Sequence, residues 1–119
     1  MVRRLKDCEE FLAGDHTVLR ELLHPRGAPV KIGYSLAHGT LAPCGRSKRH
    51  RLSSSEVYYF LTGRGTFHLD DRAIAIEPSI IVYVPPGAEQ WVENVDDSAM
   101  EFLCLVDPAW RPEDEHISE

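Results

Sequence analysis

The chain has 119 residues, of which 43% are hydrophobic and 27% are charged. This length is near the usual size of one domain and is sufficient for one hydrophobic core. The formal net charge of −6 argues against a general nucleic-acid binder. No apolar run approaches the roughly 18 residues that a membrane-spanning helix needs. The charged start, MVRRLKDCEEF, lacks the apolar segment of a signal peptide, so we expect a cytoplasmic protein that binds neither nucleic acid nor membrane.

Residues 1–16 predict a lead-in that contains one short helix. Asp7, with Glu10 three residues later, resembles a helix N-cap and its reciprocal partner. Gly14 would end this helix after one or two turns. We therefore expect the main domain to begin after residue 16.

The segment Thr17–Leu23 is compatible with a helical turn or with a strand. We favour the strand, because a barrel needs a starting strand and because Pro25 favours an extended conformation of His24. Short strands separated by turn residues then follow at near-regular spacing, which is typical of a sandwich or barrel. The expected strands are Val30–Leu41, Lys48–Leu52, Glu56–Leu61, Thr66–Leu69, Arg72–Ile76, Ile80–Val84, Glu89–Asn94 and Met100–Val106.

After the lead-in over residues 1–16, we expect two further regions. Residues 17–107 should form the β-barrel domain, and residues 108–119 should form a tail. The continuous apolar run Ile80–Val84 is typical of a strand that is covered on both faces. The tail is acidic and punctuated by proline, so we expect it to fray, with Trp110 as its one candidate anchor.

The stretch from Gly39 to Asn94 resembles the two sequence motifs of the cupin family. In the first motif, His50, Glu56 and Gly63 stand at the expected places, but Leu52 replaces the second histidine. In the second motif, Pro85, Gly87 and Asn94 fit, whereas Gln90 replaces the histidine and Ser79 replaces an upstream glycine. The resemblance implies an all-β jelly-roll barrel, also called a double-stranded β-helix, with a ligand site at its mouth.

Strand alternation then predicts which side chains would line that site. Residues two apart in a strand point to the same face, so the inner surface should combine polar groups with apolar and aromatic ones. Such a mixture is usual for a small-molecule pocket. The candidate ligand-binding residues are Lys48, His50, Leu52, Glu56, Tyr58, Phe60, Gln90 and Val92.

The resemblance also implies a divalent metal site, of which only part remains. The family uses three histidines and one glutamate, a set that suits Fe, Mn, Ni or Zn. Carried over to this chain, the candidate ligands are His50, Glu56 and Gln90, and an amide is a weak ligand. The alternative is that these three side chains hydrogen-bond to one another in a metal-free pocket. His68 could lie inside the barrel as a substitute ligand, or it could be a surface residue or a hydrogen-bonded core residue.

Four basic residues, Arg46, Lys48, Arg49 and Arg51, lie within six positions beside His50. Lys48 shares the parity of His50, so it could meet an anionic ligand such as a carboxylate or a sugar phosphate. The expected ligand is thus a small and possibly anionic molecule: a sugar, a sugar phosphate or a carboxylate. The other interpretation is a solvated basic face on the outside of the barrel, or one that pairs with the acidic surface of a partner subunit.

Two functions follow from the resemblance. The first is a small-molecule-binding module with a reduced or absent metal site. The second is a metal-dependent enzyme, either a sugar or sugar-phosphate isomerase or epimerase or, with less support, a dioxygenase.

We also expect a homodimer, because Val57, Tyr59 and Leu61 would form an outward apolar strip. Cupins commonly dimerise through strand exchange, which Thr17–Leu23 could provide.

Overall fold

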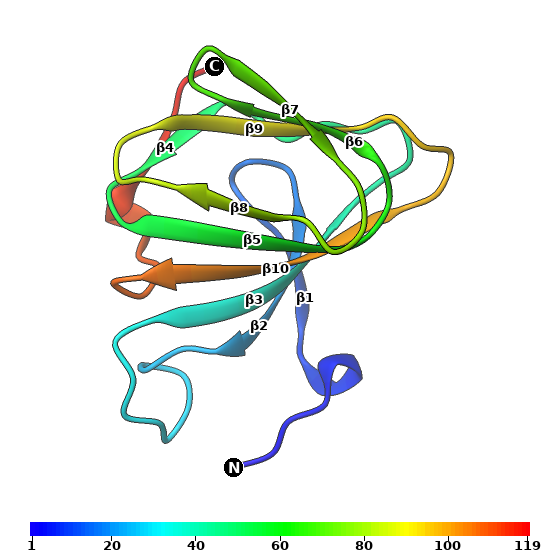
Figure 1. Ribbon diagram of the computed structural model, residues 1–119. Coiled ribbons are helices and arrows are strands. Elements are labelled where there is room, and N and C mark those ends of the chain that lie inside the picture. Colours follow the sequence, from blue (N-terminus) through cyan, green and yellow to red (C-terminus); the bar gives the residue numbers. More distant parts are fainter.

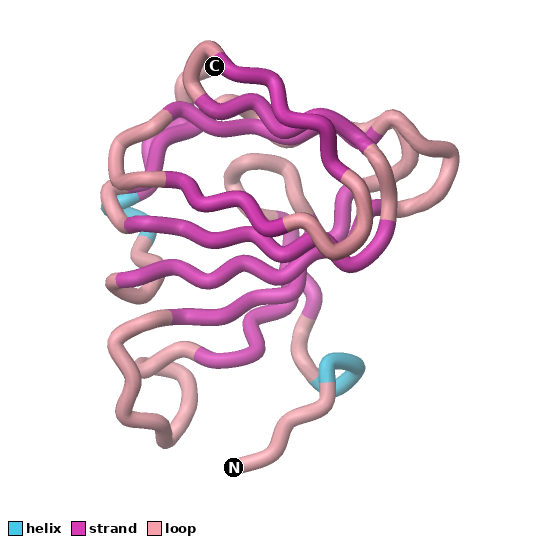
Figure 2. The backbone as a smooth tube through the Cα atoms, in the orientation of Figure 1, coloured by secondary structure: helices cyan, strands magenta, loops and turns pink.

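The structure is a computed structural model that describes residues 1–119. Two antiparallel sheets face each other and form a barrel (Figure 1), and nearly all of the regular structure is strand (Figure 2). No helix is long and apolar enough to cross a membrane. The larger sheet has the order β1-β2-β3-β10-β5-β8. Its strands are β1 (Glu10–Leu12), β2 (Val18–Leu23), β3 (Ser35–Leu41), β10 (Met100–Asp107), β5 (Ser55–Thr62) and β8 (Ile81–Val84).

The smaller sheet covers the other side of the core and has the order β11-β4-β9-β6-β7. Its central strands bring the two halves of the motif region together, since His50 lies directly opposite Gln90 in the β4–β9 pair. The all-β jelly-roll expectation is therefore confirmed. The strands are β11 (Glu115–Ile117), β4 (His50–Leu52), β9 (Glu89–Asn94), β6 (Gly65–Leu69) and β7 (Arg72–Ile76).

Strict alternation along the strands produces the core. In β9, the buried residues are Gln90, Val92 and Asn94, and in β10 every second residue from Met100 to Val106 is buried. The centre of the barrel is aromatic: Tyr58 and Phe60 stack with ring centroids 5.9 Å apart, and Phe67 and Phe102 close around them. Each such ring removes a large apolar area from water, so this cluster is the main source of stability.

One glycine is required by this packing. Gly39 on β3 faces the Phe102 ring across the sheet, and a Cβ at this position would lie 2.2 Å from a ring carbon. No side chain fits in that space, so the glycine allows β3 and β10 to keep their register beside the aromatic core.

The expected N-terminal helix is wrong. The segment forms only a 3-10 turn, η1 (Leu5–Asp7), and then continues as β1. Phe11 pairs with Leu19 of β2, so β1 adds an edge strand to the larger sheet. The Asp7 and Glu10 pattern predicted a cap, but a tertiary partner in β2 outweighs a local preference of this size.

The expected frayed tail is also wrong. After the 3-10 turn η2 (Pro112–Asp114), β11 pairs with β4 in the register Glu115 to Leu52. Ile80–Val84 differs from its prediction too, because β8 is the edge of the larger sheet, with Ile81 and Tyr83 exposed. The apolar run therefore indicated a strand but not two covered faces.

Candidate functional site

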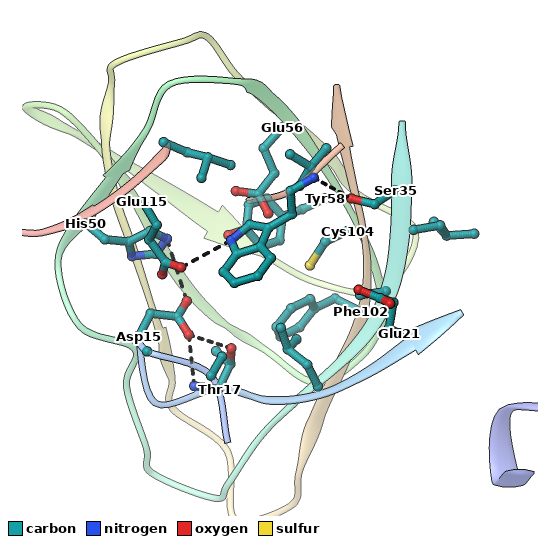
Figure 3. Close-up of a pocket in the computed structure, with 18 of the residues that line it drawn as sticks. Asp15, Thr17, Glu21, Ser35, His50, Glu56, Tyr58, Phe102, Cys104 and Glu115 are labelled. Carbon is teal, nitrogen blue, oxygen red and sulfur yellow. Dashed lines mark hydrogen bonds and ion pairs between the residues drawn. The ribbon is translucent and has the colours of Figure 1, made fainter. Parts of the chain in front are cut away.

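A cavity of about 270 Å³ lies between the sheets, and residues of both terminal segments form part of its lining. Twelve of its twenty lining residues are hydrophobic, and polar side chains from distant parts of the chain gather along its wall (Figure 3). Its size and mixed lining are those of a site for a small organic molecule. The polar lining residues are Asp15, Thr17, Glu21, Ser35, His50, Glu56 and Glu115.

Four of the eight candidate ligand-binding residues line this cavity. His50 and Leu52 reach it from β4, and Glu56 and Tyr58 reach it from β5. The inward parity expected for these two strands accounts for the arrangement, because residues two apart lie on one face. All four are less than a tenth exposed.

The other four candidates do not line the cavity. Phe60 and Val92 are packed in the hydrophobic core, with 0% and 2% of their surface exposed. Lys48 precedes β4, and its contribution near the site is its backbone carbonyl oxygen, which accepts a hydrogen bond from His50 Nδ1. Gln90 lies behind the wall, fully buried, and contacts the cavity only through its neighbours.

Gln90 connects the two polar groups on β5. Its Nε2 donates to Glu56 Oε1 at 2.9 Å, and its Oε1 accepts from the Tyr58 hydroxyl at 2.6 Å. Burial raises the pKa of the Glu56 carboxyl to about 7, although the Gln90 hydrogen bond and the charge of His50 act against this rise. Burial, together with the negative charge of Glu56, raises the pKa of Tyr58 well above its ordinary value, so the hydroxyl keeps its proton.

His50 faces Asp15, a residue that the sequence did not single out. His50 Nδ1 donates to the Lys48 carbonyl oxygen at 2.7 Å, and Nε2 lies 3.6 Å from Asp15 Oδ2. Asp15 is held in turn by Thr17, whose backbone N–H and hydroxyl both donate to Asp15 Oδ1. Gly14 was interpreted as the end of a helix, whereas Gly14 and Asp15 lie in the turn between β1 and β2.

The C-terminal segment supplies the second missed group. Trp110 lines the cavity; its backbone N–H donates to Ser35 Oγ at 3.0 Å and its Nε1 donates to Glu115 Oε2 at 3.2 Å. Burial and the neighbouring Asp15 charge raise the pKa of Glu115. The sequence indicated only Trp110 as an anchor of this segment, because residues 108–119 were otherwise expected to fray. It gave no indication that Glu115 lines the cavity.

These residues do not fit the metal site of the cupin family. Leu52 offers no donor, and both ends of the Gln90 amide are used by Glu56 and Tyr58. No three His, Cys, Asp or Glu side chains are arranged so that they could hold a metal ion. Of the expected set, Glu56 and Gln90 are hydrogen-bonded to each other, whereas His50 bonds to the Lys48 carbonyl oxygen and faces Asp15.

The remaining candidates lie outside the cavity. His68 is half-buried on the outer face of the smaller sheet, stacked on Trp91 at 3.8 Å and paired with Glu93 at 2.8 Å. The basic cluster also faces outward: Arg46 and Arg49 lie over the Trp91 ring, at 4.6 and 5.2 Å. Neither His68 nor the arginines of this cluster line the cavity.

Comparison with known proteins agrees with this architecture. Residues 37–106 match the model of the cupin domain family. Over 110 residues the chain is 30% identical to the uncharacterised protein MJ1618 of Methanocaldococcus jannaschii, covering 92% of this chain and 87% of that protein.

Two solved structures show the same fold at lower identity. A predicted oxalate decarboxylase of Thermotoga maritima superposes with a TM-score of 0.79 at 21% identity, covering 91% of this chain and 99% of that one. The nucleoside dehydratase Pac13 superposes with a TM-score of 0.78 at 20% identity, covering 100% of this chain and 91% of that one. With the family match spanning more than half of its length, the chain belongs to the cupin domain family.

Proposed function

We propose that this chain is a small-molecule-binding cupin that uses its cavity without the metal site of the family. The observation that carries the proposal is the separation of the cavity wall into two parts. Asp15, His50, Glu56 and Glu115 offer polar groups, while the other lining residues are mostly apolar. A compact ligand with one polar end and an apolar body matches such a wall.

Within this proposal, His50, Glu56 and Tyr58 form the polar end of the site and Leu52 forms part of its apolar wall. Gln90 orients Glu56 and Tyr58 from behind, and Phe60 and Val92 support the wall from the core. Lys48 acts through its carbonyl oxygen, which orients His50. An anionic carboxylate or sugar phosphate finds less support, because no residue of the basic cluster lines the cavity.

A second candidate is a metal-independent enzyme that transfers protons. The Asp15–His50 pair favours it, because a carboxylate beside an imidazole can stabilise the positive charge that the ring acquires on taking a proton. The structural neighbour Pac13 is described as a nucleoside dehydratase, which supports the idea that a cupin barrel of this size can carry out catalysis. The metal-dependent isomerase, epimerase and dioxygenase find less support, since the donors that they need are absent.

The proposal is tested by asking whether the purified protein binds a small metabolite, and whether a variant with a filled cavity loses that binding. Ala37 lines the cavity from β3, so Ala37→Phe should fill it, whereas Ala75→Phe adds the same ring on the exposed face of β7. Native mass spectrometry and a thermal-shift screen of small metabolites should find a ligand for wild type and Ala75→Phe but not for a folded Ala37→Phe.

Equal responses from all three proteins would refute the cavity as the binding site. Incubation of the captured ligand with wild type then separates the two candidates. An unchanged ligand supports a binding module, and its conversion supports an enzyme. Elemental analysis of the same preparation gives the metal content, and one transition metal per chain would overturn the metal-free part of the proposal.

We further propose that two copies pair through the outer face of the larger sheet. Tyr59 and Leu61 are 41% and 38% exposed on β5, and Ile81 and Tyr83 are 67% and 58% exposed on the neighbouring edge strand β8. Tyr59 lies opposite Ile81, so these side chains form one continuous apolar strip. A strip of this kind, beside an open strand edge, is best covered by a second copy.

A further inference from the structure

The cavity wall carries more carboxyl groups than groups that can be cationic. Four carboxyl side chains line it, from Asp15, Glu21, Glu56 and Glu115, and the one ionisable nitrogen group is the imidazole of His50. No lysine or arginine is among the lining residues. Glu21, half-buried on β2, adds a carboxyl group that forms no ion pair within the chain.

The contact between His50 and Asp15 gives a second, independent indication. A backbone carbonyl oxygen can only accept, so His50 Nδ1 must carry the hydrogen that it donates to Lys48. A neutral His50 then presents a lone pair at Nε2, and this lone pair faces Asp15 Oδ2 at 3.6 Å. The two side chains face each other beside the cavity, as Figure 3 shows, and His50 is only 4% exposed. A proton on His50 Nε2 makes the two side chains an ion pair, whereas with neutral His50 a donor from a ligand could lie between the two atoms.

The apolar part of the wall also suits a positive group. Tyr58, Phe102 and Trp110 all contribute rings to the cavity. Aromatic rings attract cations through their electron-rich faces. The volume of about 270 Å³ corresponds to roughly nine water molecules at liquid density, enough for one ring with a short polar chain.

We propose that the cavity selects a small organic cation, a protonated primary amine on a compact apolar body, in preference to an anion. The ammonium group would lie between Asp15, His50 and Glu115 and would donate to their acceptor atoms. The apolar body would lie against Leu52 and the aromatic rings. This inference rests on the proposed function, because it names the class of ligand for the same cavity.

Three probes of similar shape test the inference: 2-phenylethylamine, 2-phenylethanol and 3-phenylpropanoate. Nuclear magnetic resonance titration of the full chain at pH 7 gives the dissociation constant of each probe and the backbone amides that it shifts. We expect the amine to bind about tenfold more tightly than the alcohol, and the carboxylate to bind more weakly than both. The amides of Thr17 and Leu52 should shift.

Two conservative variants localise the preference. Asp15→Asn keeps the acceptor for Thr17, and Glu115→Gln keeps the acceptor for Trp110, so both should fold. Each should reduce the preference for the amine over the alcohol severalfold, while the exposed control Asp71→Asn should leave it unchanged. An alcohol that binds as tightly as the amine would overturn the inference and leave the small-molecule proposal intact. Tighter binding of the carboxylate would also overturn it, and binding of none of the three would count against both.

Discussion

Glu56→Gln should remove much of the pH dependence of folding stability between pH 5 and pH 8. Burial raises the pKa of the Glu56 carboxyl from its ordinary 4.5 to about 7 in the folded chain. The unfolded chain ionises this group near pH 4.5, so the folded state holds a proton that the unfolded state has lost. The stabilisation is complete below the unfolded pKa and is lost as the pH rises through the folded pKa.

The size of the effect follows from the shift. One pKa unit corresponds to about 1.4 kcal/mol, so the free energy of unfolding should fall by about 2.5 kcal/mol between pH 5 and pH 8 because of this group alone. Glutamine resembles the protonated carboxyl in shape and can still accept the hydrogen bond from Gln90 Nε2. The variant should therefore gain stability relative to wild type as the pH rises.

Urea unfolding at pH 5, 6, 7 and 8 measures this difference. Glu9→Gln serves as the control, because Glu9 is exposed, and its curve should run parallel to wild type. If the stabilities of wild type and Glu56→Gln also change in parallel with pH, the carboxyl titrates at its ordinary pKa and our account of the buried wall is wrong.

Two further predictions concern the metal site and assembly. The double variant Leu52→His with Gln90→His should bind a transition metal tightly, which would be visible as a metal-dependent rise in melting temperature. Equally strong metal binding by wild type would refute our account, in which wild type lacks the metal-ligating side chains. Light scattering at micromolar concentration should show a dimer for wild type and a monomer for the double variant Tyr59→Ser with Ile81→Ser. Val95 is exposed outside the apolar strip, so the control Val95→Ser should remain a dimer. A monomeric wild type would contradict the proposed interface.

Much of the fold could be predicted because the motif residues and the strand periodicity agree with each other. Both β7 and β9 lie where the sequence placed them, at Arg72–Ile76 and Glu89–Asn94. Their turns and alternating burial are local properties, which a single sequence expresses directly. The two terminal strands β1 and β11 are different, because each is only three residues long and owes its conformation to a partner strand far away in the chain.

The same reason explains which part of the site was missed. His50 and Glu56 belong to a sequence motif, whereas Asp15 and Glu115 reach the cavity only because the terminal segments fold over the barrel. No spacing rule connects residue 15 to residue 50. The negative character of the cavity is therefore a property of the tertiary structure, and the basic cluster near His50 pointed to the opposite charge because its arginines face outward.

The two residues that replace histidines have complementary effects on the cavity wall. Leu52 removes a donor and adds apolar surface, which suits an organic ligand more than a hydrated metal ion. Gln90 can donate and accept at the same time, so it satisfies Glu56 and Tyr58 together. A neutral imidazole also has one donor and one acceptor, but they sit at fixed positions on a rigid ring. No buried side-chain nitrogen or oxygen is left without a hydrogen-bond partner. Both substitutions therefore fit the same state, a wall that needs no metal to satisfy its buried polar groups.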